Sequence, residues 1–311
     1  MKITKQGCLL TVGIAACVAL TGCGGSSNRE AIDGTGSLSL GISDGPIHDA
    51  EKVCITFDQI EIKGVDEAPI TISLDPAEKI NLLEFQGANA APLLFNEEVP
   101  AGNYEWMRLG VDASRGSNGG MGDTGGPGCD GEASYIATAG GTFHNLFVPS
   151  GDQSGLKLVR GFTVPVNGTA NLTADWDLMK SIVAPPGLAP DVILKPVIRL
   201  VDNVAVGTLT GTVSSDLATA ENCAPSVYVF NDGIAPNPID TEVEDTEDPV
   251  ATAMVNAQEN GNDPVTYTYS VGFLLEGEYE AAFTCDGQTF EPVDGKPASI
   301  AAQQVTTVDF P

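Results

Sequence analysis

Hydrophobic and polar residues alternate along most of this 311-residue chain, in short segments with a period of two. That period places every second side chain on one face of a β-strand. Turns rich in Gly and Pro separate the segments. The clearest segments before residue 200 are Leu38–Ile42, Val53–Phe57, Ile70–Leu74, Leu156–Leu158, Phe162–Val166 and Ala170–Leu178. The pattern predicts an all-β fold of the sandwich or barrel type.

Two places depart from simple alternation. The hydrophobic phase shifts between Phe57 and Ile60, as it would across a β-bulge. Residues 77–86 carry Ile80 and Leu83 at a spacing that suits a helix, so one short helix is expected there.

A second set of strands begins after the turn at Asp202-Asn203. We therefore expect two β-sandwich domains, Ig-like or transthyretin-like, over residues 36–203 and 204–311. The strands expected in the second domain are Val206–Val213, Val227–Val229, Val265–Phe273, Tyr279–Cys285 and Val305–Phe310.

The amino terminus predicts export and lipid anchoring. Two lysines precede 13 mostly apolar residues, 8–20, which are too few to span a bilayer and are typical of a secretion signal. The segment ends in Leu20-Thr21-Gly22-Cys23, which resembles the bacterial lipobox, where cleavage leaves an acylated cysteine. An ordinary signal peptide with a chance cysteine is the alternative.

On this interpretation residues 1–22 are a lipoprotein signal peptide, and residues 23–35 are the lipidated Cys23 and a flexible tether. Acyl chains such as palmitate on Cys23 would form the membrane anchor. Gly24 after the cysteine resembles the sorting pattern for the outer membrane. The expected location is the bacterial cell envelope, lipid-anchored, in the outer membrane.

Charge excludes two classes of partner. The chain carries 42 Asp and Glu against 14 Lys and Arg, a net charge of −28. Proteins that bind nucleic acid or anionic lipid headgroups need the opposite sign, so neither partner is expected. Residues 205–311 hold 18 of the acids and a single base, Lys296. Hydrophobic residues make up 42% of the chain, which favours folded acidic domains over a disordered tail.

Four cysteines remain beyond the anchor. An even number in an exported protein favours disulfides, and two lie in each expected domain. Pairing Cys54 with Cys129 and Cys223 with Cys285 is the most economical of three arrangements. Metal ligation by these cysteines is the competing interpretation, but their spacings contain no C-x-x-C.

The segment 236–249 carries six acids within nine residues. Calcium prefers several carboxylate oxygens at once, so Asp240, Glu242, Glu244 and Asp245 are candidate ligands. The segment lacks the turn glycine and fixed spacing of an established calcium loop, and a solvated acidic loop is the alternative.

Catalytic motifs are scarce. The two histidines, His48 and His144, favour structural or surface roles, and a glycine-rich loop at 116–131 matches G-x-G-x-x-G only by composition. That loop should be mobile, or held only by Cys129.

Asp175 and Asp177 flank Trp176 and could form a carboxylate pair, but alternate positions on one strand usually face solvent. Pairing with Lys180, Lys195 or Arg199 is the better explanation.

Residues 36 to about 202 resemble the bacterial lipoprotein family catalogued as domain of unknown function 4382. The resemblance implies an exported β-rich domain and supplies no catalytic residues. Residues 206–311 resemble, more loosely, the carboxypeptidase-regulatory or transthyretin-like sandwich through Leu209–Val213 and Leu275–Tyr279. The segments that carry the first resemblance are Gly36–Leu40, Ser43-Asp44-Gly45-Pro46, Val53–Ile62, Val99–Tyr104, Met107–Leu109, Asp175–Val183 and Leu194–Arg199.

These observations favour a non-enzymatic, lipid-anchored envelope protein that acts as a structural or interaction module, with an envelope protein or polysaccharide as its partner and with no cofactor. The alternative is a surface lipoprotein that binds calcium through the acidic segment or carbohydrate through an exposed aromatic such as Trp106. An enzyme is the third class, and no reactive constellation supports it.

Overall fold

The computed structural model describes residues 34–45, 47, 50–114, 119–126, 128–138, 140–149, 155–183, 191–239, 247–259, 261 and 264–311. Within these residues the chain is built almost entirely of β-strands, which confirms the predicted all-β class. The helical segments described are short: η1 (Leu82–Glu84), α2 (Leu178–Ser181) and α3 (Ser215–Ala218). None of them has the length and apolarity that a membrane span requires.

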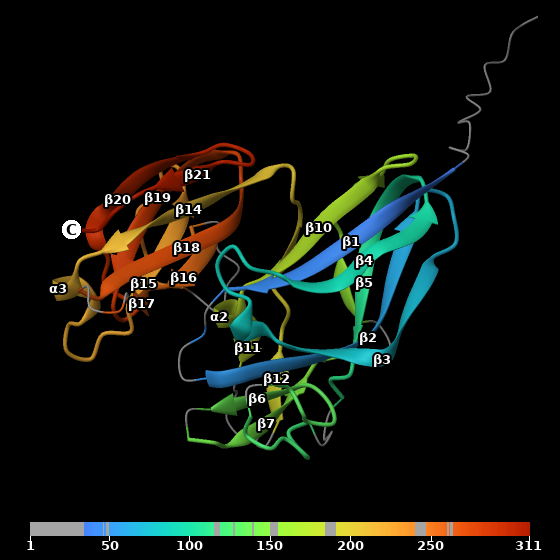
Figure 1. The fold of residues 1–311 in the computed structure, drawn as a ribbon, viewed down its shortest axis with the longest axis horizontal. Helices are drawn as coiled ribbons and strands as arrows, with labels where there is room; N and C mark the ends of the chain where they lie inside the picture. Colours follow the sequence, from blue (N-terminus) through green and yellow to red (C-terminus); the bar gives the residue numbers. More distant parts are fainter. Residues whose placement is uncertain are drawn as a thin grey trace, which may run out of the picture. The chain divides into compact units, whose positions relative to one another are not determined.

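The strands before residue 203 form two sheets. The smaller one places β1 (Thr35–Asp44) between β10 (Thr169–Trp176) and β4 (Ala91–Pro100), with β13 (Ile198–Asp202) beyond β10 (Figure 1). β1 and β10 run parallel, whereas β4 and β13 are antiparallel to their neighbours. The parallel pairing of β1 with β10 brings the carboxyl ends of two distant segments to one edge of this sheet.

The larger sheet has nine strands arranged around β2 (Ala50–Gly64). One side of β2 pairs with β3 along its length, and the other side pairs first with β6 and then with β5. The remaining strands extend the sheet in the order β11-β12-β7-β6 at one end and β5-β8 at the other, with β9 also on β5. The bounds are β3 (Ile70–Asn81), β5 (Gly102–Val111), β6 (Tyr135–Thr138), β7 (Phe143–Phe147), β8 (Leu156–Leu158), β9 (Phe162–Val164), β11 (Ile182–Val183) and β12 (Asp191–Leu194).

The alternating residues of both sheets form one hydrophobic core. Its members include the first series identified in the sequence, Leu38, Leu40 and Ile42, together with Trp176 at the end of β10. Burial of these side chains is what fixes the strand register, because a slip by one residue would turn the whole apolar face outward.

The strands after residue 205 form two four-stranded sheets with a separate core. One has the order β17-β18-β14-β21 and the other β16-β15-β19-β20. The bounds are β14 (Val206–Val213), β15 (Ser226–Asn231), β16 (Ala251–Met254), β17 (Asn256–Gln258), β18 (Thr266–Leu275), β19 (Gly277–Thr284), β20 (Glu291–Ile300) and β21 (Val305–Thr307).

The predicted bulge is confirmed, since the pairing of β2 with both β3 and β5 shifts register between Phe57 and Gln59. The predicted helix over 77–86 is wrong. Residues up to Asn81 belong to β3, and only η1 follows. Ile80 and Leu82 are both buried, so the segment also fits a period of two, and pairing with β2 decides for strand.

One alternating series is also interrupted. The sequence expects Phe273 to continue the inward series of β18, but its φ is +57° and Leu274 is fully buried instead. β14 and β18 shift register opposite this point, between Gly207 and Leu209. Because of this bulge, Leu274 and not Phe273 packs into the core.

Candidate functional site

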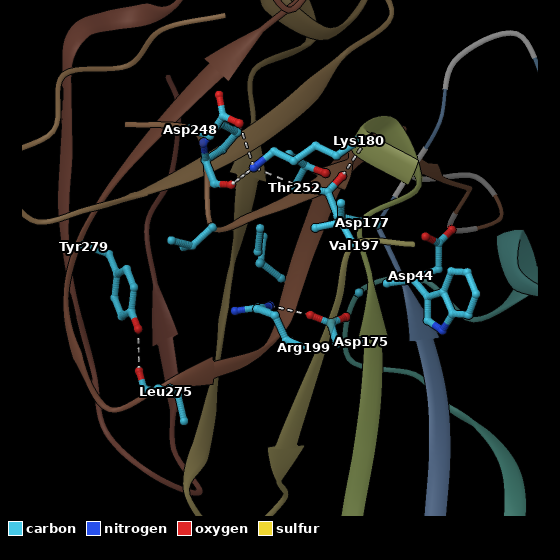
Figure 2. Close-up of a pocket in the computed structure, with 18 of the residues that line it drawn as sticks. Asp44, Asp175, Asp177, Lys180, Val197, Arg199, Asp248, Thr252, Leu275 and Tyr279 are labelled. Carbon is cyan, nitrogen blue, oxygen red and sulfur yellow. Dashed lines mark hydrogen bonds and ion pairs between the residues drawn. The ribbon is translucent and has the colours of Figure 1, made fainter. Parts of the chain in front are cut away.

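A cavity of about 380 Å³ lies where the carboxyl end of β1 and the segment from β10 to α2 meet β16, β18 and β19. Figure 2 shows its charged side chains, with Asp175 and Arg199 between Tyr279 on one side and Asp44 on the other. The apolar lining includes Val197, Val250, Val271 and Leu275. This is a size typical of sites for small organic ligands.

Sheet register places the acidic residues at one end of the sheet, with Asp44 on the face of Trp176 and Asp175 on the opposite face. In the parallel pair of β1 and β10, Ser43 lies opposite Asp175 and Asp44 lies opposite Trp176. In the antiparallel pair of β10 and β13, Asp175 lies opposite Arg199. Segments separated by more than 130 positions in the sequence thus deliver their charged groups to one edge of a sheet.

Asp175 forms an ion pair with Arg199, and its side chain is only 12% exposed. Burial raises the pKa of Asp175 above its usual range, and the Arg199 guanidinium offsets part of that rise. The pair links β10 to β13 on the face that lines the cavity.

Asp177 caps the N-terminus of α2 by accepting a hydrogen bond from the Lys180 amide at 3.2 Å. The Lys180 ammonium lies 3.6 Å from the Asp177 carboxylate and 3.2 Å from that of Asp248, and it donates to the Pro249 carbonyl at 3.0 Å. Burial raises the pKa of Asp177, and Lys180 partly offsets the rise. Lys180 therefore connects the strands before residue 203 to those after residue 205.

Asp44 differs from the other acids. It is 2% exposed, and neither carboxylate oxygen has a hydrogen-bond partner of normal geometry. Burial raises the pKa of Asp44 well above its usual range, and the nearby Asp175 and Asp177 carboxylates raise it further. The amides of Leu178 and Gly45 lower it in part. An unpaired buried carboxylate of this kind is costly to the fold.

The cavity carries a negative excess. Four aspartates line it, at positions 44, 175, 177 and 248, against Lys180 and Arg199. Among the described residues of the chain, no group of three or more His, Cys, Asp and Glu side chains is arranged to hold a metal ion. The arrangement suits the recognition of positive charge beside an apolar surface.

The two predicted disulfides are confirmed. Cys54 is bonded to Cys129 with a Cα–Cα distance of 5.7 Å, and Cys223 is bonded to Cys285 with a distance of 4.5 Å. Cys54 lies in β2 and Cys129 in the glycine-rich loop, so the first bond attaches that loop to the large sheet.

Side chains hold the described part of this loop as well. The Lys52 ammonium lies 3.0 Å from the Asp123 carboxylate and 2.8 Å from the Gly128 carbonyl, and Tyr135 donates a hydrogen bond to Asp123. The sequence indicates only Cys129 as an attachment, so sequence reasoning misses this cluster.

Trp106 lies on β5, partly buried, among charged side chains. The Arg108 guanidinium and the Lys157 ammonium lie over its ring at 4.8 and 4.7 Å from the centroid. Arg108 also forms an ion pair with Glu61. A sugar that stacks on Trp106 must therefore compete with two cations for the ring.

The expectation that Asp175 and Asp177 face solvent is wrong, because both are largely buried. The expected pairing with Arg199 and Lys180 is confirmed. His144 lies on β7 and is partly buried. Four predicted features lie outside the described residues: Cys23 with the signal peptide and the tether up to residue 33, His48, the acidic residues Asp240, Glu242, Glu244 and Asp245, and the start of the glycine-rich loop. The last residue assigned to the tether, Thr35, is the first residue of β1.

Sequence reasoning does not identify Asp44 as a site residue. The one available signal is the breaker cluster Ser43-Asp44-Gly45-Pro46, which by itself indicates only a turn. Its neighbours in the cavity come from Asp175–Lys180 and from Val197 and Arg199, so three of the segments that carry the family resemblance meet at this point.

A family model bears directly on this arrangement. The model for DUF4382, a domain of unknown function, matches residues 35–196, just over half of the chain. The chain belongs to this family. The DUF4382 region covers β1 to β12 and α2, and so includes Asp44, Asp175, Asp177 and Lys180. Residues 206–311, which supply the opposite wall of the cavity, lie beyond it.

A search of the curated proteins found no match to the sequence. Among solved structures, a leucine-rich repeat protein from Bacteroides thetaiotaomicron shares 12% identity over 89% of this chain and 26% of that one, with a TM-score of 0.21. The Bacillus anthracis TIE protein shares 10% identity, with 89% of this chain and 33% of that one covered and a TM-score of 0.18. The chain thus spans about a quarter to a third of these two proteins.

The minor pilin GBS52 of Streptococcus agalactiae matches over 88% of this chain and 94% of its own, at 10% identity and a TM-score of 0.20. Similarity at this level does not identify a function for the DUF4382 protein.

Proposed function

We propose that this DUF4382 protein is an exported, lipid-anchored envelope protein that acts as a structural or interaction module and not as an enzyme. The observation that carries the proposal is the state of the cavity. Every charged side chain that lines it, except Asp44, is committed to an ion pair. Charges held in this way fix the geometry of a surface, whereas general acid–base catalysis needs a group that can reach a substrate and exchange its proton. The carboxylate oxygens of Asp44, the one exception, are buried away from solvent.

The two disulfides support export. Disulfides persist in the periplasm and at cell surfaces, and they are rare in the reducing cytosol. One disulfide lies on each side of residue 205, so each set of sheets contains a bond of the kind found in exported proteins. Anchoring is supported by the lipobox-like segment Leu20-Thr21-Gly22-Cys23, since acylation of Cys23 would attach the protein to the membrane.

Anchoring is tested by the variant Cys23→Ser, with Ser27→Ala in the tether as the matched control. Mass spectrometry of the mature protein should find acyl chains on Cys23 of the parent and of the control. Cell fractionation should place both with the outer membrane and the Cys23→Ser variant elsewhere. Unchanged fractionation of Cys23→Ser would contradict the anchor.

The interaction role is tested by crosslinking in intact cells, with the anchored protein compared to Cys23→Ser. A specific envelope protein or polysaccharide should be crosslinked to the anchored form. Turnover of a substrate by the purified protein would overturn the non-enzymatic part of the proposal.

A second candidate function is binding of an acidic polysaccharide at Trp106, where carboxylates of the polysaccharide would pair with Arg108 and Lys157 and draw these cations off the ring. Trp106→Ala should abolish retention on an acidic polysaccharide matrix, whereas Phe95→Ala, which removes an aromatic that is 81% exposed, should not.

Calcium binding by residues 240–248 is tested separately by calorimetry. Absence of heat at millimolar Ca²⁺ would rule out calcium binding.

A further inference from the structure

We propose that the free edge of β13 binds an extended peptide segment of a partner protein, which adds a strand to the smaller sheet and places an acidic side chain at Arg160. This rests on the proposed interaction role and names the chemistry of one partner. Three features carry the inference: backbone groups that point away from the sheet, a groove beside them, and the exposed cation Arg160 in the groove lining.

The first feature is the backbone of β13. Within the described part of the chain, β13 pairs only with β10, so its other edge carries no strand. The Asn203 amide donates to the Asn171 carbonyl at 2.9 Å, which fixes the phase of this antiparallel ladder. Because hydrogen-bonded pairs alternate in such a ladder, the N–H and C=O groups of Ile198 and Leu200 point away from β10. An edge of this kind can accept a further strand.

The second feature is a groove of about 220 Å³ that follows this edge. Four consecutive residues, 198–201, line it, so it runs along the backbone of β13 and not over one face of the sheet. Leu158, Val159 and Leu275 line the same groove. Leu200 is 4% exposed, so water reaches its outward backbone groups poorly, and a paired strand would satisfy them.

The groove lining is mostly apolar, and its member Val159 is 76% exposed. An exposed apolar side chain beside an unpaired strand edge favours contact with other chains. A peptide with an apolar residue at every second position would pack on this lining while its backbone pairs with β13.

The third feature is Arg160, which sets the charge of the partner. It forms no ion pair with any residue that the structure describes, whereas Arg199, the other cation of the lining, is paired with Asp175. A carboxylate of the peptide can therefore pair with Arg160. The net charge of −28 opposes an acidic partner, but at physiological salt charges more than about 8 Å away are largely screened, so the adjacent Arg160 dominates.

The test uses the mature, detergent-solubilised protein and a synthetic peptide of alternating valine and threonine with one central glutamate, capped at both ends. This peptide should bind with a Kd below about 1 mM. Two versions methylated at alternate amides each lose the donors of one edge. Their affinities should differ by about tenfold, because only one edge of the peptide pairs with β13.

The variant Arg160→Glu tests the charge. It should weaken binding of the glutamate peptide by about tenfold and strengthen binding of the same peptide with lysine in place of glutamate. Lys195→Glu, at an exposed position outside the groove, makes the same change in net charge and should leave both affinities unchanged. Both substituted positions are exposed, so neither variant should disturb the fold.

Hydrogen exchange locates the bound peptide. The glutamate peptide should slow exchange in residues 198–202 and leave β4, the strand at the other end of the smaller sheet, unchanged.

Absence of binding at about 10 mM peptide, protection of β4 in place of β13, equal affinities of the two methylated versions, or an unchanged peptide preference of Arg160→Glu would overturn the inference. A dimer in which β13 is already protected would also overturn it, since a second copy would then occupy the edge. The fractionation and crosslinking tests of the proposed function do not depend on any of these results.

Discussion

At the scale of single residues, the fold tolerates one costly group. Asp44 is buried without a hydrogen bond of normal geometry, only the amides of Leu178 and Gly45 lower its pKa, and the charged groups that affect that pKa are two other carboxylates. Burial of a carboxyl group without well-formed hydrogen bonds costs the folded state free energy.

Asp44→Asn should stabilise the protein at pH 8 by about 1–3 kcal/mol, since it removes a buried acid whose ionisation favours the unfolded chain above pH 4. The folded pKa of Asp44 is raised above the unfolded value near 4. Stability contributed through Asp44 is therefore lost as pH rises through that folded pKa, and the advantage of the variant should vanish near pH 4. Calorimetry at both pH values measures this, and lower stability of Asp44→Asn at pH 8 would contradict it.

Asp123 shows the opposite behaviour. Burial acts to raise the pKa of Asp123, but hydrogen bonds from Tyr135, the Gly125 amide and Lys52 outweigh it and bring the pKa to about 2. Its stabilising contribution is present above pH 4 and is lost as pH falls toward 2.

Asp123→Asn should cost about 3–5 kcal/mol at pH 7, because the Lys52 ammonium, only 9% exposed, would lose its charged partner. The acid limb of its stability curve should also be flatter than that of the parent. Urea unfolding between pH 2 and 7 measures both effects. Asp130→Asn, exposed in the same loop, is the control and should change stability by less than about 1 kcal/mol.

At the scale of elements, the disulfides close long loops. The bonded cysteines are 75 and 62 positions apart. Restricting loops of this length in the unfolded chain stabilises a protein by about 4 kcal/mol in the chain-entropy model. Each bond lies within one set of sheets, so its effect should be local.

Replacing Cys223 and Cys285 with Ser should lower stability by about 4 kcal/mol and speed hydrogen exchange mainly in β14–β21, while replacing Cys54 and Cys129 should act mainly on β1–β13. Hydrogen exchange with mass spectrometry resolves the two regions. Equal acceleration of both regions in either double variant would show that the sheets unfold as one unit.

At the scale of the whole molecule, Lys180 lies between the two sets of sheets. Its side chain is 17% exposed, and that of Asp248 is 5% exposed. Lys180→Met should destabilise the protein by about 3–5 kcal/mol, because two largely buried carboxylates lose their cation. In calorimetry the unfolding temperatures of the two sets of sheets should lie further apart than in the parent protein. Lys195→Met, at an exposed position nearby, should leave the trace unchanged.

Charge on the last third of the chain makes a further prediction. Residues 205–311 carry 18 acids and only Lys296, which donates to the Asp309 carbonyl at 2.6 Å and lies over the Phe310 ring. Self-repulsion among these acids is screened by salt. Protection of β14–β21 from hydrogen exchange should therefore rise between low and physiological ionic strength. Protection that stays constant would contradict this.

Much of the fold follows from local pattern. The alternation around Leu38–Ile42 and Ala170–Trp176 predicts strands correctly, because one buried face requires period two wherever the chain is extended. The register shift at Phe57 is visible for the same reason. The helix expected over 77–86 fails because Ile80 and Leu82 satisfy both periods, and only pairing with β2 selects between them.

What the sequence by itself determined is most of the buried strand faces and the sign of the charge, since these depend on residue type and near spacing; it favoured the cysteine pairing that the structure confirms but left other pairings open. Tertiary structure alone decided the cavity. Asp44 and Asp175 reach the same end of one sheet because β1 and β10 are parallel neighbours, and Lys180 meets Asp248 because the segment before β16 packs against α2. Such contacts join residues far apart in sequence, and no local period records which distant strand will become a neighbour.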